Sequence, residues 1–124
     1  MQPEIRELCL ALGRLTHEDD QRMFMHEHPV LLDPGIVEAL AEDVRTTVRV
    51  DVPQALILAD AAVVIANELQ HPTAMARALR AKANAVWMMG DCKAATELFT
   101  RAANLFEEAG KIDEVGRTLS SSLQ

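Results

Sequence analysis

The stretch ARALRAKANAVWMMGDCKAATELFTRAANLFEEA, residues 76–109, contains two helix-forming segments that meet at Gly90 and Asp91. Small and apolar side chains recur in both segments at the spacing of one helix face. A glycine followed by an aspartate is typical of a helix end and the cap of the next helix. The stretch therefore predicts two antiparallel helices joined by a tight turn.

The same pattern occurs forty residues earlier in the chain. When residues 50–79 are aligned with residues 90–119, seven positions are identical, whereas unrelated segments of this length would share about two. The identical pairs are Asp51 and Asp91, Ala55 and Ala95, Leu58 and Leu98, Ala62 and Ala102, Glu68 and Glu108, Arg77 and Arg117, and Leu79 and Leu119. A period of this length indicates stacked structural units, which usually bind other molecules rather than transform them.

The composition favours an all-α fold. The chain has 124 residues, the size of one domain, and only 3% of them are aromatic. Its hydrophobic residues are mainly Ala, Leu, Val and Met, which suit closely packed helices. Val48–Val52 is the one serious candidate strand, and no partner strand is apparent in the sequence.

Capping residues predict where most helices begin. Asp33, Asp51 and Asp91 each stand directly before an apolar helical pattern. We expect a helix pair within 1–32, then helices over about 34–47, 52–69, 73–89 and 92–109, and a seventh from 112 onward. Gly13 is expected to loosen the end of the first helix, and Gly110 to end the sixth as a left-handed cap.

The net charge of −7 disfavours binding to nucleic acids and to anionic membranes, because both need clustered basic residues. No apolar run is expected to approach the length of a bilayer span, and the N-terminus lacks a signal-peptide pattern. Cys9 and Cys92 lie far apart without a CxxC motif. They are therefore interpreted as reduced thiols in the core of a cytoplasmic protein.

Residues 76–109 resemble a tetratricopeptide repeat at that family's own spacing. Small or aromatic residues occupy its first, eighth, twentieth, twenty-fourth and twenty-seventh positions, namely Ala76, Ala83, Ala95, Phe99 and Ala102. The departures are Leu79, Lys82 and Val86, which stand where the family has Trp, Leu and Tyr. The resemblance implies a tetratricopeptide-like α-solenoid, a right-handed stack of antiparallel hairpins with about seven helices.

The resemblance also implies a division of the single domain 1–124. An N-terminal helix pair (1–32) would precede a degenerate repeat (33–72), the best-formed repeat (73–109) and the first helix of an incomplete repeat (110–124). The apolar face of that last helix, made of Ile112, Val115, Leu119 and Leu123, would lack a partner of its own. The array is thus expected to be cut short, with self-association through the incomplete repeat as one consequence.

The segment His28-Pro29-Val30-Leu31-Leu32 resembles a motif ahead of tetratricopeptide arrays in large bacterial proteins, many of which end in a CHAT protease domain. This resemblance implies an alternative function, as the regulatory N-terminal fragment of a CHAT-type protease or signalling NTPase. The catalytic His and Cys of such a protease would lie in a later domain. Neither role can be carried over to Cys9 or Cys92.

Six residues are candidates for a peptide-binding groove. They hold positions that line the concave surface in the family that the chain resembles: Arg77, Arg80, Asn84, Trp87, Met88 and Arg117. Arg80 and Asn84 are one helical turn apart, so both can reach one ligand carboxylate. A basic groove on an acidic protein favours acidic peptides or C-termini. Alternatively, the arginines pair with Glu38, Glu42 or Asp43 on the preceding helix.

The third candidate function is a metal-dependent enzyme. His17-Glu18-Asp19-Asp20 and His26-Glu27-His28 contain imidazoles and carboxylates that are typical metal ligands. However, the segment contains no HExxH motif, His26 and His28 would lie on different faces of a helix, and a solvated acidic loop explains these residues as well. The sequence therefore favours a non-catalytic protein–protein interaction scaffold without a metal or cofactor, whose partner is a protein or an acidic peptide.

Overall fold

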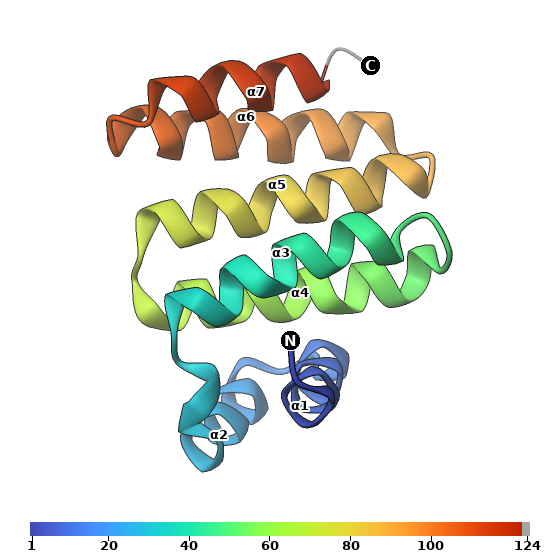
Figure 1. Ribbon diagram of the computed structural model, residues 1–124, viewed down its shortest axis with the longest axis vertical. Coiled ribbons are helices and arrows are strands. Elements are labelled where there is room, and N and C mark those ends of the chain that lie inside the picture. Colours follow the sequence, from blue (N-terminus) through green and yellow to red (C-terminus); the bar gives the residue numbers. More distant parts are fainter. Residues whose placement is uncertain (123–124) are drawn as a thin grey trace.

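The computed structural model describes residues 1–122, which form seven α-helices, one short 3-10 helix and no strand (Figure 1). The elements are α1 (Pro3–Arg14), α2 (Glu18–Glu27), η1 (Pro29–Leu31), α3 (Pro34–Thr47), α4 (Val52–Leu69), α5 (Pro72–Met88), α6 (Cys92–Glu108) and α7 (Ile112–Ser122). The prediction of an all-α fold is confirmed. Val48–Val52 forms a turn and the first residue of α4 rather than a strand.

Three aspartates begin helices as their positions predict. The carboxylates of Asp33, Asp51 and Asp91 accept hydrogen bonds from the backbone N–H groups at the starts of α3, α4 and α6, over 2.8, 3.0 and 3.1 Å. Each bond satisfies a backbone donor that has no partner within its helix. A fourth cap is His71, whose Nδ1 accepts from the N–H of Ala74 over 3.0 Å and starts α5 at Pro72.

From α3 onward, consecutive helices pack on one another (Figure 1). α3 also packs on α5, so these two helices lie side by side although α4 separates them in the sequence. α1 crosses the direction of the later helices and packs chiefly on α4, whereas α1 and α2 touch each other little. The N-terminal helices therefore cover α4 and do not form a closely packed hairpin of their own.

Alanines form much of the core between α4, α5 and α6. Ala62, Ala78 and Ala102 are completely buried, and side chains of this size let helix axes approach closely. Larger buried side chains lie on several helices, with Leu12 on α1, Leu40 on α3, Leu58 on α4, and Phe99 and Phe106 on α6. The sequence therefore builds a helix stack in which small residues set the spacing.

We expect Ala102→Leu to lower the free energy of unfolding by about 1–3 kcal/mol, because Ala102 has no exposed surface and the added carbons would have to displace α5 or α7. Ala95→Leu should behave in the same way. Urea unfolding followed by circular dichroism measures the change. The matched control is Ala109→Leu at the exposed end of α6, which should change stability by less than about 0.5 kcal/mol.

The prediction that no apolar run approaches the length of a bilayer span was wrong for α4. Its 18 residues have a mean hydropathy of 1.5, so α4 is the one helix in the described part of the chain that is long and apolar enough to cross a membrane. Asp60 and Glu68 are its only acidic or basic residues. Core helices of soluble proteins pass the same test, and here α4 packs on α1, α3 and α5.

The two cysteines differ in their surroundings. Cys9 is buried in the core, and burial raises the pKa of its thiol to about 11, which keeps the thiol protonated and inert. Cys92 is exposed at the start of α6, so the prediction that it lies in the core was wrong. The buried cluster of Ala83, Ala95 and Phe99, to which α6 contributes Ala95 and Phe99, does not include Cys92.

The last helix exposes part of its apolar face. Ile112 and Leu119 of α7 are 66% and 45% exposed, whereas Val115 is half-buried. Leu123, the fourth residue expected on this face, lies outside the described residues, as does Gln124. Thr118 of the same helix is completely buried and accepts a hydrogen bond from Arg80 of α5.

Candidate binding groove

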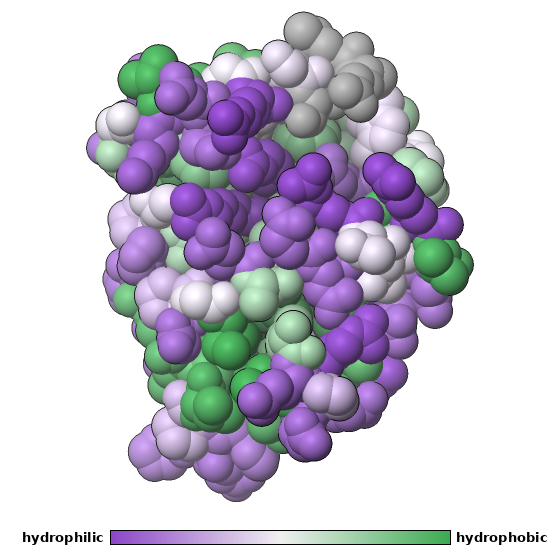
Figure 2. Space-filling view, viewed as in Figure 1, coloured by the Kyte–Doolittle hydropathy of each residue, from purple (hydrophilic) through white to green (hydrophobic). Residues whose placement is uncertain are grey.

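One face of the molecule has a polar groove that is lined by α3, α5 and α7. The groove encloses about 230 Å³. Its lining side chains are Glu38, Ala41, Glu42 and Arg45 from α3, Arg77, Arg80, Ala81 and Asn84 from α5, and Glu114 and Arg117 from α7. Figure 2 shows mainly hydrophilic side chains on this face over α5 and α7. With four arginines and three glutamates, the groove is slightly basic on a protein of net charge −7.

Helical spacing brings the α5 residues to one face. The lining residues of α5 recur every three or four positions, so each lies about one turn after the one before. They are Arg77, then Arg80 and Ala81, then Asn84. Ala81, which also lines the groove, has a shorter side chain than the other lining residues of α5. Four of the six candidate groove residues, Arg77, Arg80, Asn84 and Arg117, therefore line the same groove.

A carboxylate already lies in this groove, bound by arginines. Arg80 Nη1 donates to Glu114 Oε2 over 2.6 Å, and Arg117 Nη1 donates to Glu114 Oε1 over 3.2 Å. Arg80 also donates to Thr118 Oγ1 over 3.3 Å, and its guanidinium lies 5.0 Å from the centre of the Phe106 ring. Arg80 thus joins α5 to α6 and α7.

The surroundings of Glu114 favour its ionised form. The hydrogen bond from Arg80 holds the pKa of the Glu114 carboxyl below its ordinary value, against the partial burial that would raise it. The positive charges of Arg117 and Arg77 act in the same direction as this hydrogen bond. The groove therefore stabilises a carboxylate anion at the α7 end of its lining.

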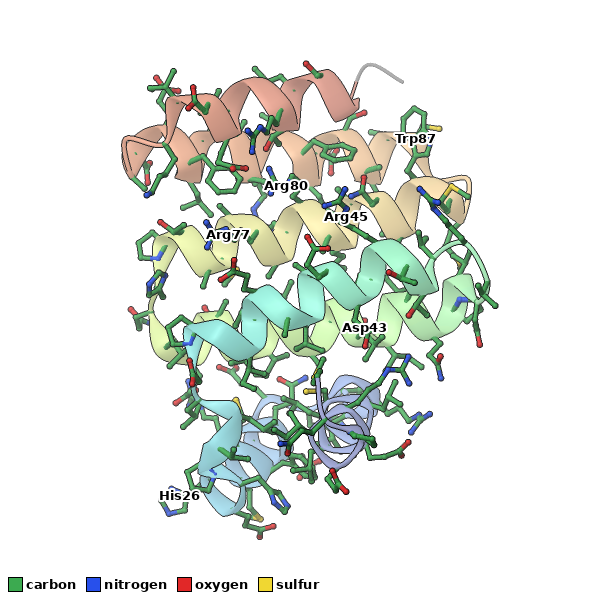
Figure 3. The ribbon with its side chains drawn as sticks, viewed as in Figure 1. His26, Asp43, Arg45, Arg77, Arg80 and Trp87 are labelled. Atoms are coloured by element: carbon green, nitrogen blue, oxygen red, sulfur yellow. The ribbon has the colours of Figure 1, made fainter. Side chains whose placement is uncertain are left out.

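Two lining residues keep polar groups available. Arg77 is half-buried and makes no ion pair or side-chain hydrogen bond with the residues that the structure describes. The side-chain amide of Asn84 is likewise half-buried and without a hydrogen-bond partner in residues 1–122. Figure 3 shows Arg77 and Arg80 along α5, with Arg45 of α3 beside them. Guanidinium and amide donors on one helix face can bind a second carboxylate.

Trp87 and Met88, the other two candidate residues, do not line this groove. Trp87 packs against the cluster of Ala83, Ala95 and Phe99 between α5 and α6. Figure 3 places Trp87 near the end of α5, away from Arg77. Its indole is large and apolar, and burial against α6 removes more of it from water than a position in a polar groove would. Met88 is 56% exposed outside the groove.

The alternative pairing of the arginines with α3 is also not what the structure shows. Arg80 pairs with Glu114 on the following helix rather than with Glu38, Glu42 or Asp43. Glu42 pairs with Arg45 on its own helix over 3.1 Å. Asp43 pairs with Arg6 of α1 over 2.8 Å, outside the groove.

The histidine-rich segment does not assemble into a metal centre. Among residues 1–122 no group of three His, Cys, Asp or Glu side chains lies close enough to hold a metal ion. His17 is the N-cap position of α2, and His28 stacks on Phe24 with ring centroids 4.6 Å apart. His26 is exposed near the far end of the molecule from the groove (Figure 3).

Of the charged groove residues, Arg45 and Glu114 are the two that were named neither as candidates nor as pairing partners from the sequence. Arg45 follows Glu38 and Glu42 at helical spacing, so an amphipathic reading of 34–47 places all three on one face. Glu114 precedes Arg117 by three residues, which predicts their pairing within α7. Its stronger contact with Arg80 crosses 34 residues of sequence, and no local pattern indicates it.

No protein-family model, curated protein or solved structure matches this chain. The chemistry of the groove must therefore be inferred from its own side chains.

Proposed function

We propose that this protein is a non-catalytic interaction scaffold whose α3–α5–α7 groove binds an acidic peptide segment of a partner protein. The observation that carries the proposal is the carboxylate of Glu114, which Arg80 and Arg117 hold within the groove. This pairing supports a groove whose donors suit a carboxylate. Arg77 and Asn84 make no side-chain hydrogen bond or ion pair with the described residues, and they would bind a second carboxylate, supplied by the partner peptide.

A tetratricopeptide-like arrangement supports the same function. The helices that the resemblance assigns to the first position of each hairpin are α3, α5 and α7, and these are the helices that line the groove. Gly90 and Gly110 have positive φ angles of 93° and 73°, as tight turns between such helices need. We propose that the chain is a short α-solenoid of this type and that its groove corresponds to the concave surface of such arrays.

We expect Arg77→Gln to weaken the binding of an acidic peptide about tenfold or more, since a hydrogen bond to a charged group is lost. Stability should change by less than about 0.5 kcal/mol, because Arg77 makes no ion pair within the described residues. Fluorescence anisotropy with a fluorescein-labelled decapeptide rich in Asp and Glu measures the affinity. A matched peptide with Lys in place of the acids should not bind.

The control variant is Arg49→Gln, which removes an exposed arginine in the turn between α3 and α4, outside the groove. It should leave the affinity for the acidic peptide unchanged. A carboxylate site at Arg77 would be contradicted if wild type and Arg77→Gln bound the acidic peptide equally tightly. It would also be contradicted if Arg77→Gln and Arg49→Gln lost the same amount of affinity.

A further inference from the structure

A second groove lies on the other side of α5, between α4 and α6. These two helices both pack on α5 and barely touch each other within the described residues, so α5 forms the floor between them (Figure 1). The groove encloses about 450 Å³, and α2 closes one end of it. It shares no lining residue with the α3–α5–α7 groove.

Each of the three helices α4, α5 and α6 contributes apolar side chains to the lining of this α4–α6 groove. Val63 and Val64 of α4, Met75 of α5 and Leu98 of α6 are only half-buried, so each presents part of its side chain to the groove. An adjoining cavity of about 210 Å³ shares Met75 and is also lined by Leu105. The two cavities are thus neighbours that share Asn67 and Met75 in their linings.

The spacing of the lining residues matches the surface of another helix. Leu98, Arg101 and Leu105 lie on one face of α6 and span two turns, about 10 Å along the axis. A helix that lay in the groove would contact this face with side chains at positions i, i+3, i+4 and i+7. Side-chain ridges of such a helix pack naturally into a channel between two neighbouring helices.

The charged side chains at the rim of the groove indicate what kind of helix it would bind. Lys82 pairs with Asp60 over 3.0 Å, and Arg22 pairs with Glu18 over 3.0 Å and approaches Glu68 at 3.7 Å. Arg101 is exposed and has no carboxylate partner among the described residues. The acidic and basic side chains at the rim are therefore equal in number, and Arg101 is the one basic group among these that has no carboxylate within ion-pair distance.

We propose that the α4–α6 groove docks an amphipathic helix of a partner protein, with its apolar face on Val63, Leu98 and Leu105 and an acidic residue against Arg101. Four half-buried apolar side chains would lose their remaining contact with water, and the guanidinium of Arg101 would gain a carboxylate. This site goes beyond the peptide groove proposed above, from which it is separated by α5. The protein would then hold two partner segments on opposite faces.

The test uses the full chain with labelled Leu, Val and Met methyl groups. The probe is a capped amphipathic peptide of about fourteen residues with leucines at i, i+3, i+4 and i+7 and glutamates beside them. The comparison peptide has lysines in place of the glutamates. We expect saturable methyl shifts at Val63, Val64, Met75, Leu98 and Leu105, and tighter binding of the glutamate peptide.

Arg101→Glu should weaken the glutamate peptide about fivefold and strengthen the lysine peptide, as expected for one exposed ion pair. Arg49→Glu, an equal change of charge at an exposed site away from the groove, should leave both affinities unchanged. Shifts confined to other methyl groups, the absence of saturable shifts, or equal affinities of the two peptides would each overturn the proposal. None of these outcomes bears on the acidic-peptide groove, which Arg77→Gln tests separately.

Discussion

Replacing Gly13 with alanine is expected to destabilise the protein by about 3 kcal/mol, the upper end of the usual cost of overpacking. A Cβ atom at Gly13 would lie 2.1 Å from the carbonyl oxygen of Ile57 and 2.8 Å from its Cγ2. The carbonyl belongs to the backbone of α4 and cannot rotate away. α1 would therefore have to move off α4, with loss of the burial of Cys9, Leu10 and Leu12.

Urea unfolding of Gly13→Ala and Gly116→Ala measures the effect with its matched control. Gly116 lies within α7, and a Cβ atom there would meet nothing within 4 Å. Alanine should therefore stabilise the helix at Gly116 by about 0.5–1 kcal/mol. Opposite signs for the two glycines are the expected result. A neutral or stabilising Gly13→Ala would contradict the close contact between α1 and α4.

Replacing Arg80 with alanine is expected to cost about 1–3 kcal/mol, because it leaves the partly buried Glu114 carboxylate without its main donor. The variant also loses the contact of the guanidinium with Phe106 and the hydrogen bond to Thr118. Arg22→Ala is the matched control, since the Arg22–Glu18 pair is 60% and 71% exposed and should contribute less than about 1 kcal/mol.

The Arg80 effect should depend on pH. The pKa of Glu114 is lowered in the folded state, so its contribution to stability is present above the pKa of the unfolded chain. That contribution is lost as the pH falls through the lower, folded-state pKa. The difference in unfolding free energy between wild type and Arg80→Ala should therefore shrink on acidification. A difference that stays constant from neutral to strongly acidic pH would mean that the ion pair does not stabilise α7.

Local features of the sequence were sufficient to predict most of the fold. Asp33, Asp51 and Asp91 cap helices through backbone groups two or three residues away, so their role can be read from adjacent residues. Gly110 ends α6 with a positive φ for the same local reason. Helix type and order follow from such signals and from the spacing of apolar residues.

Contacts between distant residues could not be predicted. Gly13 was interpreted as a residue that loosens a helix end, whereas its role depends on Ile57, which lies on another helix. Arg80 was predicted to bind a ligand or to pair with an acidic residue of 34–47, but Glu114, 34 residues later, pairs with it. Trp87 has the helical spacing of a groove residue, and only its packing on α6 shows that it lies outside the groove.

The most direct test of the acidic-peptide groove is a titration with the acidic decapeptide, in which NMR follows the side-chain signals of Arg77 and Asn84. A carboxylate bound between α3, α5 and α7 must accept hydrogen bonds from the Arg77 guanidinium and the Asn84 amide. Saturable shifts of the Arg77 Nε–H and Asn84 Nδ2–H signals, with one dissociation constant, are the predicted result. Saturable binding that leaves both signals unchanged would contradict the account.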